Sequence, residues 1–312
     1  IKNIFGGNRN MKTEKIWMDG KFVAWDDAKI HVLTHALHYG SGVFEGIRAY
    51  KTDEGTAVFR LKEHVERLFN SAKILRLELP FSKEEISKAI KETVKINHLD
   101  SCYIRPLVYR GYKKLGINPF SCPVQVMIAA WEWGAYLGEE ALSKGISAMI
   151  SSWQRSHINS TSAKAKICAN YINSVFASME AIEFGVEEAI LLDSNGYVAE
   201  GPGENIFWVK DGIIYTPPLT AVLDGITRKT VITIAQDMGY EIREEFVARD
   251  VLYTADEAFF AGTAAELTPI REIDHYTIGS GERGPISKEI QDKLFKVFTG
   301  KEKKYLDWLD FV

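Results

Sequence analysis

Cysteine is scarce in this sequence, and long apolar runs are absent. The three cysteines, Cys102, Cys122 and Cys168, are widely spaced and match neither a zinc-binding nor a redox motif. This pattern argues against a secreted disulfide scaffold and favours a reducing compartment such as the cytoplasm. No apolar stretch reaches the ~18 residues that a membrane helix needs, because Gln125 and Glu132 interrupt the strongest one. We therefore expect no membrane-spanning segment.

An excess of charge of one sign is also missing. The 38 Lys and Arg residues nearly balance the 42 Asp and Glu residues, which gives a formal net charge of -4. A lysine run at Lys301, Lys303 and Lys304 is interrupted by Glu302 and is typical of a solvated surface. We therefore expect neither nucleic acid nor a membrane as a partner.

The length and composition are those of a globular protein of about two domains. The 312 residues are 46% hydrophobic, which is enough for a sizeable core. We interpret residues 1–13 as a polar N-terminal extension in which Met11 is a candidate start. We expect a small α/β domain over residues 14–132, an interdomain loop over 133–142 and a large domain over 143–312.

Two Asp-Gly pairs predict hairpins. Asp19-Gly20 lies in the middle of the strand-like residues 15–25, and Asp211-Gly212 lies in the middle of residues 206–215. Asp-Gly favours the tight turns that join antiparallel strands. Each pair therefore predicts two neighbouring strands.

Helical spacing of apolar residues predicts two helices between Leu61 and His98. Ser82 and Glu85 form a capping box at the start of the second helix. Further strands are expected at about residues 102–109, 124–133, 146–153, 188–193, 240–247 and 257–261, and further helices at about 170–184, 226–238 and 285–299. The fold class is therefore mixed α+β, and the second domain is expected to be a partly closed sheet with helices outside.

Two lysines stand in an apolar, small-residue stretch just before a predicted helix, in Lys164-Ala165-Lys166. A desolvated lysine has a lowered pKa and can form an imine with an aldehyde, such as that of pyridoxal 5′-phosphate (PLP). Taken alone, the segment is more typical of two surface lysines at a helix entrance.

Three further segments offer polar turns or helix ends. Residues 200–204, Glu-Gly-Pro-Gly-Glu, precede a strand and not a helix, so they are not a dinucleotide fingerprint. Residues 223–228 open a helix whose first N–H groups could bind phosphate, and residues 262–269 form a turn after a strand. Each segment alone is explained by a solvated turn or a capped helix.

In this order along the chain, these segments and the motifs Phe44-Glu45-Gly46-Ile47-Arg48 and Tyr103-Ile104-Arg105-Pro106 resemble the branched-chain aminotransferases. These are class IV aminotransferases of PLP fold type IV, and the resemblance extends from Ile16 to Phe311. It implies PLP as cofactor, a large domain built as a pseudo-barrel with outer helices, and amino transfer between L-leucine, L-isoleucine or L-valine and 2-oxoglutarate. It also implies a homo-oligomer, a dimer or hexamer, because Tyr39 reaches the partner subunit's site in the family.

The resemblance implies the cofactor site. Lys166 matches the Schiff-base lysine, five residues before Tyr171, which matches the phenol beside the cofactor's 3′-oxygen; Lys164 is then not the attachment point. Glu200 matches the carboxylate that keeps the pyridine nitrogen protonated. The remaining cofactor-binding residues are expected to be Arg67, Ile226, Thr227 and Thr263 at the phosphate and Leu223 against the ring.

The resemblance also implies the substrate site. Tyr103, with the backbone of Thr263 and Ala264, matches the site for the α-carboxylate. Arg105 lies two residues after Tyr103 on one predicted strand, so both side chains point to one face, and we expect Arg105 to bind the γ-carboxylate of glutamate. The rest of the substrate site is expected to comprise Tyr39, Phe44, Gly46, Trp133, Tyr136 and Tyr171.

Two features depart from the commonest family pattern, and a third suggests another chemistry. Ile167 and Cys168 stand where small residues usually follow the lysine, and the loop at residues 111–116 differs in length and polarity from some relatives, so the side-chain preference is not predicted. Three histidines, His31, His35 and His38, have no cysteine or acidic residue at metal-ligand spacing, so we expect ordinary local hydrogen bonds and no metal.

Other activities on the same fold stay open. A D-amino-acid aminotransferase or an aminodeoxychorismate lyase would share Lys166, Glu200 and Arg67, whereas the motifs at residues 44–46 and 103–105 favour the L-branched-chain enzymes. A non-catalytic ligand-binding protein with this fold is a third alternative.

Overall fold

The computed structural model describes residues 11–134 and 139–312. These residues form two compact units: unit 1 contains 134, 139–164 and 171–296, and unit 2 contains 11–133, 165–170 and 297–312. The segment around Lys166 and the C-terminal residues therefore pack with unit 2, whereas the sequence alone predicts both within a large domain over 143–312. Tyr136 lies outside the described residues.

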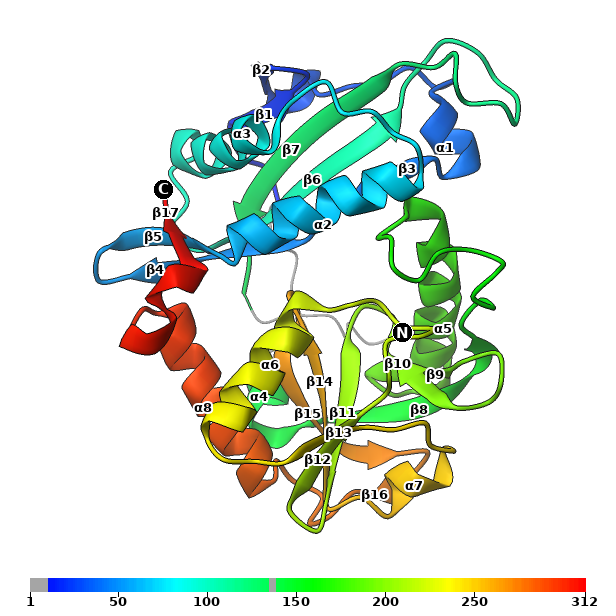
Figure 1. Cartoon of the computed structure of the whole chain (residues 1–312), viewed down its shortest axis with the longest axis vertical. Helices are drawn as coiled ribbons and strands as arrows, with labels where there is room; N and C mark the ends of the chain where they lie inside the picture. The colour runs from blue at the N-terminus through cyan, green and yellow to red at the C-terminus, as the bar shows by residue number, and fades with distance from the viewer. Residues whose placement is uncertain (1–10, 135–138) are drawn as a thin grey trace. The chain divides into compact units, whose positions relative to one another are not determined.

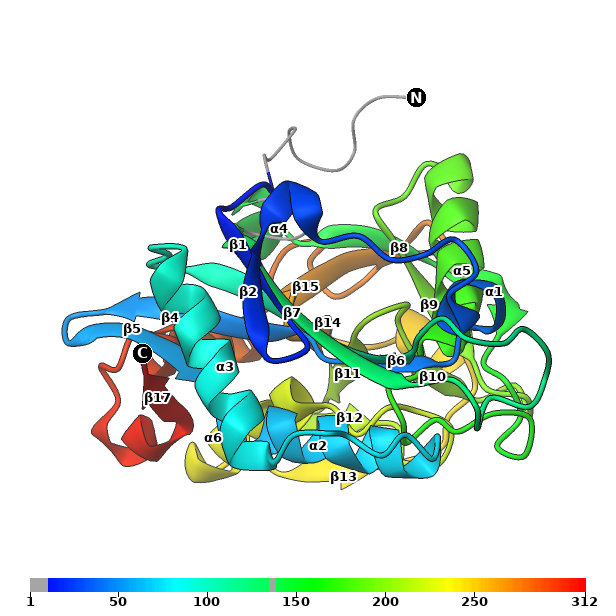
Figure 2. The same cartoon turned by 90° about the horizontal axis from the view of Figure 1, so that it is seen from above.

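Unit 2 is built on an antiparallel sheet of eight strands. Its order is β17-β5-β4-β6-β7-β1-β2, and β3 also pairs with β6 (Figures 1 and 2). The strands are β1 (Lys15–Met18), β2 (Lys21–Ala24), β3 (Gly42–Phe44), β4 (Ile47–Thr52), β5 (Gly55–Phe59), β6 (Cys102–Arg110), β7 (Val124–Glu132) and β17 (Leu309–Phe311). The hairpin predicted at Asp19-Gly20 is confirmed, since β1 pairs with β2 and both turn residues have positive φ.

Helices α2 (Leu61–Ile74) and α3 (Lys83–Ile96) pack against each other and against the sheet of unit 2 (Figure 1). The predicted capping box of Ser82 and Glu85 is present at the start of α3. Val65 and Leu68 on α2 share a buried cluster with Ile104 of β6, which fixes the helix on the sheet. Shorter helices in this unit are η1 (Trp25–Asp27), α1 (His35–Tyr39), η2 (Cys168–Asn170) and η3 (Lys303–Trp308).

Unit 1 contains a closed ring of six strands. The order β10-β9-β8-β15-β14-β11 returns to its start because β10 also pairs with β11, through Glu200 opposite Asn205. The strands are β8 (Ile146–Gln154), β9 (Glu188–Leu192), β10 (Val198–Glu200), β11 (Asn205–Lys210), β12 (Ile213–Thr216), β13 (Ile242–Glu244), β14 (Glu257–Gly262), β15 (Glu266–Ile273) and β16 (Tyr276–Thr277). The predicted pseudo-barrel is confirmed, and its closing pair includes Glu200.

Helices pack around the strands of unit 1. They are α4 (Glu139–Lys144) on β15, α5 (Tyr171–Phe184) on β8 and β9, α6 (Ile226–Asp237) on β13 and β14, α7 (Asp250–Tyr253) and α8 (Pro285–Phe298) (Figure 1). The buried carboxylate of Glu257 accepts hydrogen bonds from the backbone N–H groups of Ile286 and Ser287, at 2.9 and 2.7 Å, and so caps α8. In the part of the chain that the structure describes, no helix has the length and apolarity needed to cross a membrane.

Candidate active site

The predicted site residues are divided between the two units. Unit 2 carries Tyr39, Phe44, Gly46, Arg67, Tyr103, Arg105, Trp133 and Lys166, and unit 1 carries Tyr171, Glu200, Leu223, Ile226, Thr227, Thr263 and Ala264. In unit 1 these residues stand at a strand end, in turns and in the first turns of helices, whereas in unit 2 Tyr103 and Arg105 lie within β6 and Arg67 lies in the middle of α2.

Lys166 is held through its backbone between a strand and a helix of unit 2. Its N–H donates to Ser71 Oγ on α2 at 3.0 Å, and its carbonyl accepts from the N–H of Phe44 on β3 at 3.0 Å. The next residue, Ile167, bridges to Val43 on β3. The Lys166 Nζ lies 5.1 Å from the centre of the Phe44 ring. Strand β3 and helix α2 therefore fix the backbone position of Lys166.

Lys164 belongs to unit 1 and is exposed. Desolvation lowers the pKa of Lys164 below its usual value, while its Nζ donates to the Leu219 carbonyl. A lowered pKa alone would favour Lys164 as the imine-forming amine. The choice of Lys166 therefore depends on the family resemblance and stays a prediction.

Arg67 forms a two-point ion pair with the buried Glu45. The guanidinium Nε and Nη2 donate to the two carboxylate oxygens at 2.6 and 2.8 Å, and His64 Nδ1 lies 2.8 Å from Glu45 Oε2. Burial alone would raise the pKa of Glu45, but the charge and hydrogen bonds of Arg67, with His64, hold it at about 2. Glu45 is therefore ionised at neutral pH.

Arg105 and Tyr103 lie together on β6 of unit 2. The Arg105 Nη2 donates to Tyr103 Oη at 2.8 Å, which confirms that both side chains point to one face. The Arg105 guanidinium lies 4.5 Å from the centre of the Phe44 ring, within range of a cation–π contact. Its Nε is buried and makes no hydrogen bond to any residue that the structure describes. A ligand carboxylate would satisfy this donor.

Gly46 and Trp133 border Tyr103. A Cβ at Gly46 would lie 2.1 Å from Tyr103 Oη, so a side chain there would displace the hydroxyl. The Trp133 ring packs at 4.9 Å from the Tyr103 ring. The Tyr103 hydroxyl is therefore confined by the strand, by Gly46 and by Trp133.

The histidines near Tyr39 make local contacts. His35 Nδ1 lies 2.6 Å from Ser41 Oγ, His38 Nε2 lies 2.8 Å from the Val32 carbonyl, and His31 accepts from the N–H of Leu33 at 3.1 Å. These are the ordinary hydrogen bonds that the sequence predicted. Tyr39, at the end of α1, is 46% exposed.

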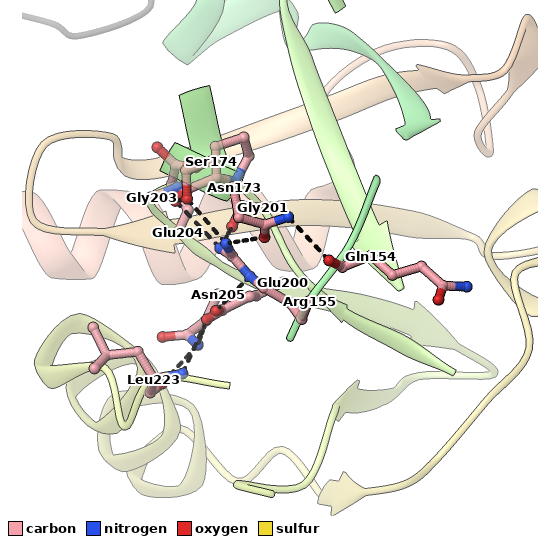
Figure 3. A network of polar contacts seen from close by, with 11 residues as sticks. Gln154, Arg155, Asn173, Ser174, Glu200, Gly201, Gly203, Glu204, Asn205 and Leu223 are labelled. Carbon is pink, nitrogen blue, oxygen red and sulfur yellow. Dashed lines mark hydrogen bonds and ion pairs between the residues drawn. The ribbon is translucent and has the colours of Figure 1, made fainter. Parts of the chain in front are cut away.

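Glu200 of unit 1 is buried at the closing pair of the barrel (Figure 3). Its Oε1 lies 2.9 Å from Arg155 Nε, and its Oε2 accepts from the Leu223 N–H at 3.1 Å and from Asn205 Nδ2 at 3.4 Å. A carboxylate that two hydrogen bonds and one ion pair hold in one orientation is suited to pair with a ring nitrogen. The same Asn205 amide donates to the Leu223 carbonyl at 3.0 Å, so it fixes the segment before α6.

Arg155 connects Glu200 with the first turn of α5 (Figure 3). Beyond its contact with Glu200, Nη1 donates to Asn173 Oδ1 at 3.1 Å and Ser174 Oγ at 2.9 Å, while Nη2 donates to the carbonyls of Gly201 and Pro202 at 2.6 and 3.2 Å. Helix α5 begins at Tyr171. The contacts of one guanidinium thus hold the two segments that carry Glu200 and Tyr171.

The start of α6 and the β14–β15 turn offer backbone donors. The N-cap residue of α6 is Gly225, which provides no side-chain cap to the first N–H groups of the helix, at Ile226 and Thr227. A Cβ at Gly225 would lie 2.0 Å from Asn205 Oδ1, so this approach requires glycine. Thr263 and Ala264 form the turn between β14 and β15. An uncapped helix start is a suitable phosphate seat.

Several residues of these networks were missing from the sequence analysis as site residues: Glu45, His64, Arg155 and Asn205. His64 and Arg67 are three residues apart on a predicted helix, which places them on one face, so this pair had a readable signal. Glu45 and Arg155 had none, because their partners come from distant segments.

Comparison with known proteins identifies the family. The family described as Amino-transferase class IV matches residues 42–273. The branched-chain-amino-acid aminotransferases of Pseudomonas aeruginosa and Escherichia coli K12 are 52% and 48% identical, over 95% and 96% of this chain and 97% and 98% of their own. The structure of the Escherichia coli enzyme has a TM-score of 0.94 at 48% identity, covering 96% of this chain and 99% of that one. A second solved branched-chain amino acid aminotransferase, from the organism abbreviated T.th., has TM-scores of 0.94 with pyridoxamine 5′-phosphate and 0.93 with N-(5′-phosphopyridoxyl)-L-glutamate, at 53% and 51% identity, and both cover 97% of this chain and 99% of that one. The chain therefore belongs to the class IV aminotransferase family.

Proposed function

We propose that this chain is a PLP-dependent aminotransferase that moves the amino group between L-leucine, L-isoleucine or L-valine and 2-oxoglutarate, with Lys166 as the lysine to which PLP is attached. Relatives named for this activity are 52% and 48% identical over almost the whole chain. Solved relatives hold pyridoxamine 5′-phosphate or N-(5′-phosphopyridoxyl)-L-glutamate. The observation that carries the proposal is the pairing of Arg105 with Tyr103 and Phe44, since a cation between aromatic rings suits both a charged and an apolar side chain.

The donors and acceptors of the two units fit PLP. In unit 2, the Arg67 guanidinium suits the phosphate and the Lys166 amine suits the aldehyde. In unit 1, the uncapped start of α6 suits the phosphate, and the buried carboxylate of Glu200 suits the pyridine nitrogen. Each functional group of the cofactor therefore has a matching group in the chain.

When bound, PLP supplies an electron sink for the negative charge that develops at the substrate Cα. Glu200 would hold a proton on the pyridine nitrogen, and Tyr171 would donate to the 3′-oxygen. Lys166 would carry the proton between the substrate Cα and the cofactor's C4′ carbon.

Substrate selection would depend on Tyr103, Arg105 and Phe44. Tyr103, with the backbone N–H groups of Thr263 and Ala264, would bind the α-carboxylate. Burial of a leucine, isoleucine or valine side chain against Phe44 and the other aromatic residues gains roughly 1.5 to 3 kcal/mol. Arg105 would bind the γ-carboxylate when glutamate is the donor.

A screen of amino donors with 2-oxoglutarate tests this function. L-leucine, L-isoleucine and L-valine should yield L-glutamate, while their D-isomers should not, because the relatives' names and the motifs around Phe44 and Tyr103 favour the L-branched-chain enzymes. Transfer from D-donors alone would show a D-amino-acid aminotransferase. The absence of transfer from every donor, with PLP bound, would contradict aminotransferase activity.

We also propose that the chain forms a homo-oligomer, at least a dimer. The segment that leads into α1 and α1 itself expose the large apolar side chains of Ile30, Val32, Leu37 and Tyr39, which a second copy would cover. Sedimentation velocity should show a dimer or a larger assembly, and Leu37→Glu should dissociate it. A monomeric wild-type protein would contradict this proposal.

We further propose a cytoplasmic location. Cys102, Cys122 and Cys168 are all unpaired thiols, which suits a reducing compartment. Fractionation of cells that express the tagged chain should recover it with cytoplasmic markers, whereas recovery from an extracytoplasmic fraction would contradict this location.

A further inference from the structure

The ion pair between Glu45 and Arg67 presents a problem for phosphate binding. Glu45 is 0% exposed, and its carboxylate lies 2.6 and 2.8 Å from two nitrogens of the Arg67 guanidinium. A fixed negative charge so close to Arg67 weakens the attraction of this cation for a phosphate dianion. On charge alone, Glu45 would therefore be a poor neighbour for a phosphate-binding arginine.

The geometry of the pair favours a different role for Glu45. Its carboxylate takes the side edge of the guanidinium, formed by Nε and one hydrogen of Nη2, so the end edge formed by Nη1 and Nη2 lies outside this pair. The end edge can itself bind a phosphate in two-point fashion. A long arginine side chain also loses rotamer freedom when it binds a ligand, and a preformed ion pair reduces that loss.

Glu45 is itself rigidly held. It follows β3, and its N–H donates to the Pro106 carbonyl at 3.0 Å. Its Oε2 also accepts from Nδ1 of His64, one turn before Arg67 on α2. Burial lowers the pKa of His64 below its usual value, although the hydrogen bond and charge of Glu45 act in the opposite direction. Because an ionised carboxylate can only accept, Nδ1 is the donor in this contact, and His64 orients the carboxylate.

The elements that hold Glu45 and Arg67 are the same ones that hold Lys166. The residue before Glu45, Phe44, donates its N–H to the Lys166 carbonyl, and Ser71, one turn after Arg67, accepts from the Lys166 N–H. On the basis of the proposed function, we propose that Glu45, supported by His64, is a positioning residue: it fixes the Arg67 guanidinium so that it can bind the phosphate of PLP, on the same elements that hold Lys166. The gain from a fixed guanidinium then outweighs the repulsion between the Glu45 carboxylate and the phosphate.

Glu45→Gln tests this proposal, because the loss of Arg67 orientation would weaken PLP binding whereas the loss of a nearby negative charge would strengthen it. The amide NH2 of glutamine would face the donors of Arg67 and His64, so the guanidinium would lose its orientation while the local charge rises by one. We expect apo-protein titrated with PLP to show an affinity weaker by roughly 10- to 100-fold, the range typical of residues that orient a ligand-binding group. Pyridoxal, which lacks the phosphate, should bind with less than about threefold change.

Glu63→Gln is the matched control. Glu63 stands on the same helix and also accepts from an arginine, Arg60 Nε at 2.6 Å, but its side chain is 39% exposed. Its substitution should leave both titrations unchanged. In an Arg67→Lys background, Glu45→Gln should cause no further loss of PLP affinity, because Glu45 acts through the guanidinium.

Three results would overturn the proposal. They are an unchanged or higher PLP affinity in Glu45→Gln, an equal loss for PLP and pyridoxal, and a full additional loss in the Arg67→Lys background. If Glu45→Gln does not fold, as judged by circular dichroism, Glu45→Asp keeps the charge and shortens the carboxylate. It should weaken PLP at least tenfold, and wild-type affinity would overturn the proposal. A wild-type chain that binds neither PLP nor pyridoxal would instead contradict the proposed function.

Discussion

Replacement of Arg105 by methionine should separate glutamate from leucine as amino donors. Methionine keeps an apolar stem of similar length beside Phe44 but removes the guanidinium that donates to Tyr103 Oη at 2.8 Å. The γ-carboxylate of glutamate or 2-oxoglutarate would then be buried without a cation. Leucine carries no such charge.

The two donors should differ widely in the size of the effect. Loss of one partner of a buried, hydrogen-bonded charge pair costs about 2 to 5 kcal/mol, which weakens glutamate on the order of 30- to 4,000-fold. We expect the lower half of this range, because Arg105 is only partly buried. For leucine the loss is the stacking of the cation on the Phe44 ring, about 0.5 to 1 kcal/mol, or less than tenfold.

Single-turnover kinetics of each half-reaction measures both effects. Tyr103→Phe reports how much of the loss passes through the Tyr103 hydroxyl, which serves both donors. Arg110→Met is the matched control on the same strand, because Arg110 donates only to the carbonyls of Cys122 and Arg76, at 3.1 and 2.6 Å, among the described residues. Arg110→Met should lower the single-turnover rates with glutamate and with leucine equally, and it should also lower the melting temperature. Equal losses for glutamate and leucine in Arg105→Met would show that Arg105 only braces the site.

Glu200→Gln should retain PLP and lose most of its kcat, because a neutral amide cannot hold the pyridine nitrogen protonated; near wild-type kcat would rule out this pairing. Arg155→Lys should lower both kcat and the melting temperature, since three ammonium donors cannot replace five guanidinium contacts, at a cost of roughly 1 to 3 kcal/mol. A lowered melting temperature with unchanged kcat would make Arg155 purely structural. The pKa of Glu45 is depressed from 4.5 to about 2 by Arg67 and His64, against burial, so its contribution to stability is complete above pH 4.5 and is lost as the pH falls towards 2. In Glu45→Gln the free energy of unfolding should therefore depend less on pH over this range. An unchanged slope of the free energy against pH would contradict the ionised pair.

Local sequence signals predicted the elements whose causes are local. The Asp-Gly turns and the capping box of Ser82 mark real boundaries, and the helices expected to end at about residues 238 and 299 end at Asp237 and Phe298, shortly before glycines with positive φ. The strand expected over residues 240–247 is wrong in length, since β13 covers only Ile242–Glu244. Beyond it, the Glu245 N–H still donates to the Thr216 carbonyl at 3.1 Å, but the Val247 carbonyl accepts from Val198 and not from β12.

Pairing between distant segments could not be predicted from local patterns. β17 joins the sheet of unit 2 through β5, about 250 residues earlier in the chain, and no turn signal connects them. The closure of the barrel by Glu200 and Asn205 likewise depends on the register of two short strands. The sequence shows which residues are suited to strands here, but it does not show which distant strand each one pairs with.

The same limit applies to the site. Lys166, Glu200 and Arg67 follow from the resemblance, and the shared face of Tyr103 and Arg105 follows from the strand period. The partner of Arg67 could not be inferred, because Glu45 is brought to α2 by the pairing of β3 with the distant strand β6.

The attachment of PLP to Lys166 is the central claim, and chemical trapping tests it most directly. PLP-loaded protein is reduced with borohydride and digested, and the modified lysine is located by mass spectrometry, for the wild type and for Lys164→Ala and Lys166→Ala. We expect a phosphopyridoxyl group on Lys166 in the wild type and in Lys164→Ala, and neither modification nor turnover in Lys166→Ala. A phosphopyridoxyl group on Lys164, or turnover that survives Lys166→Ala, would contradict the assignment.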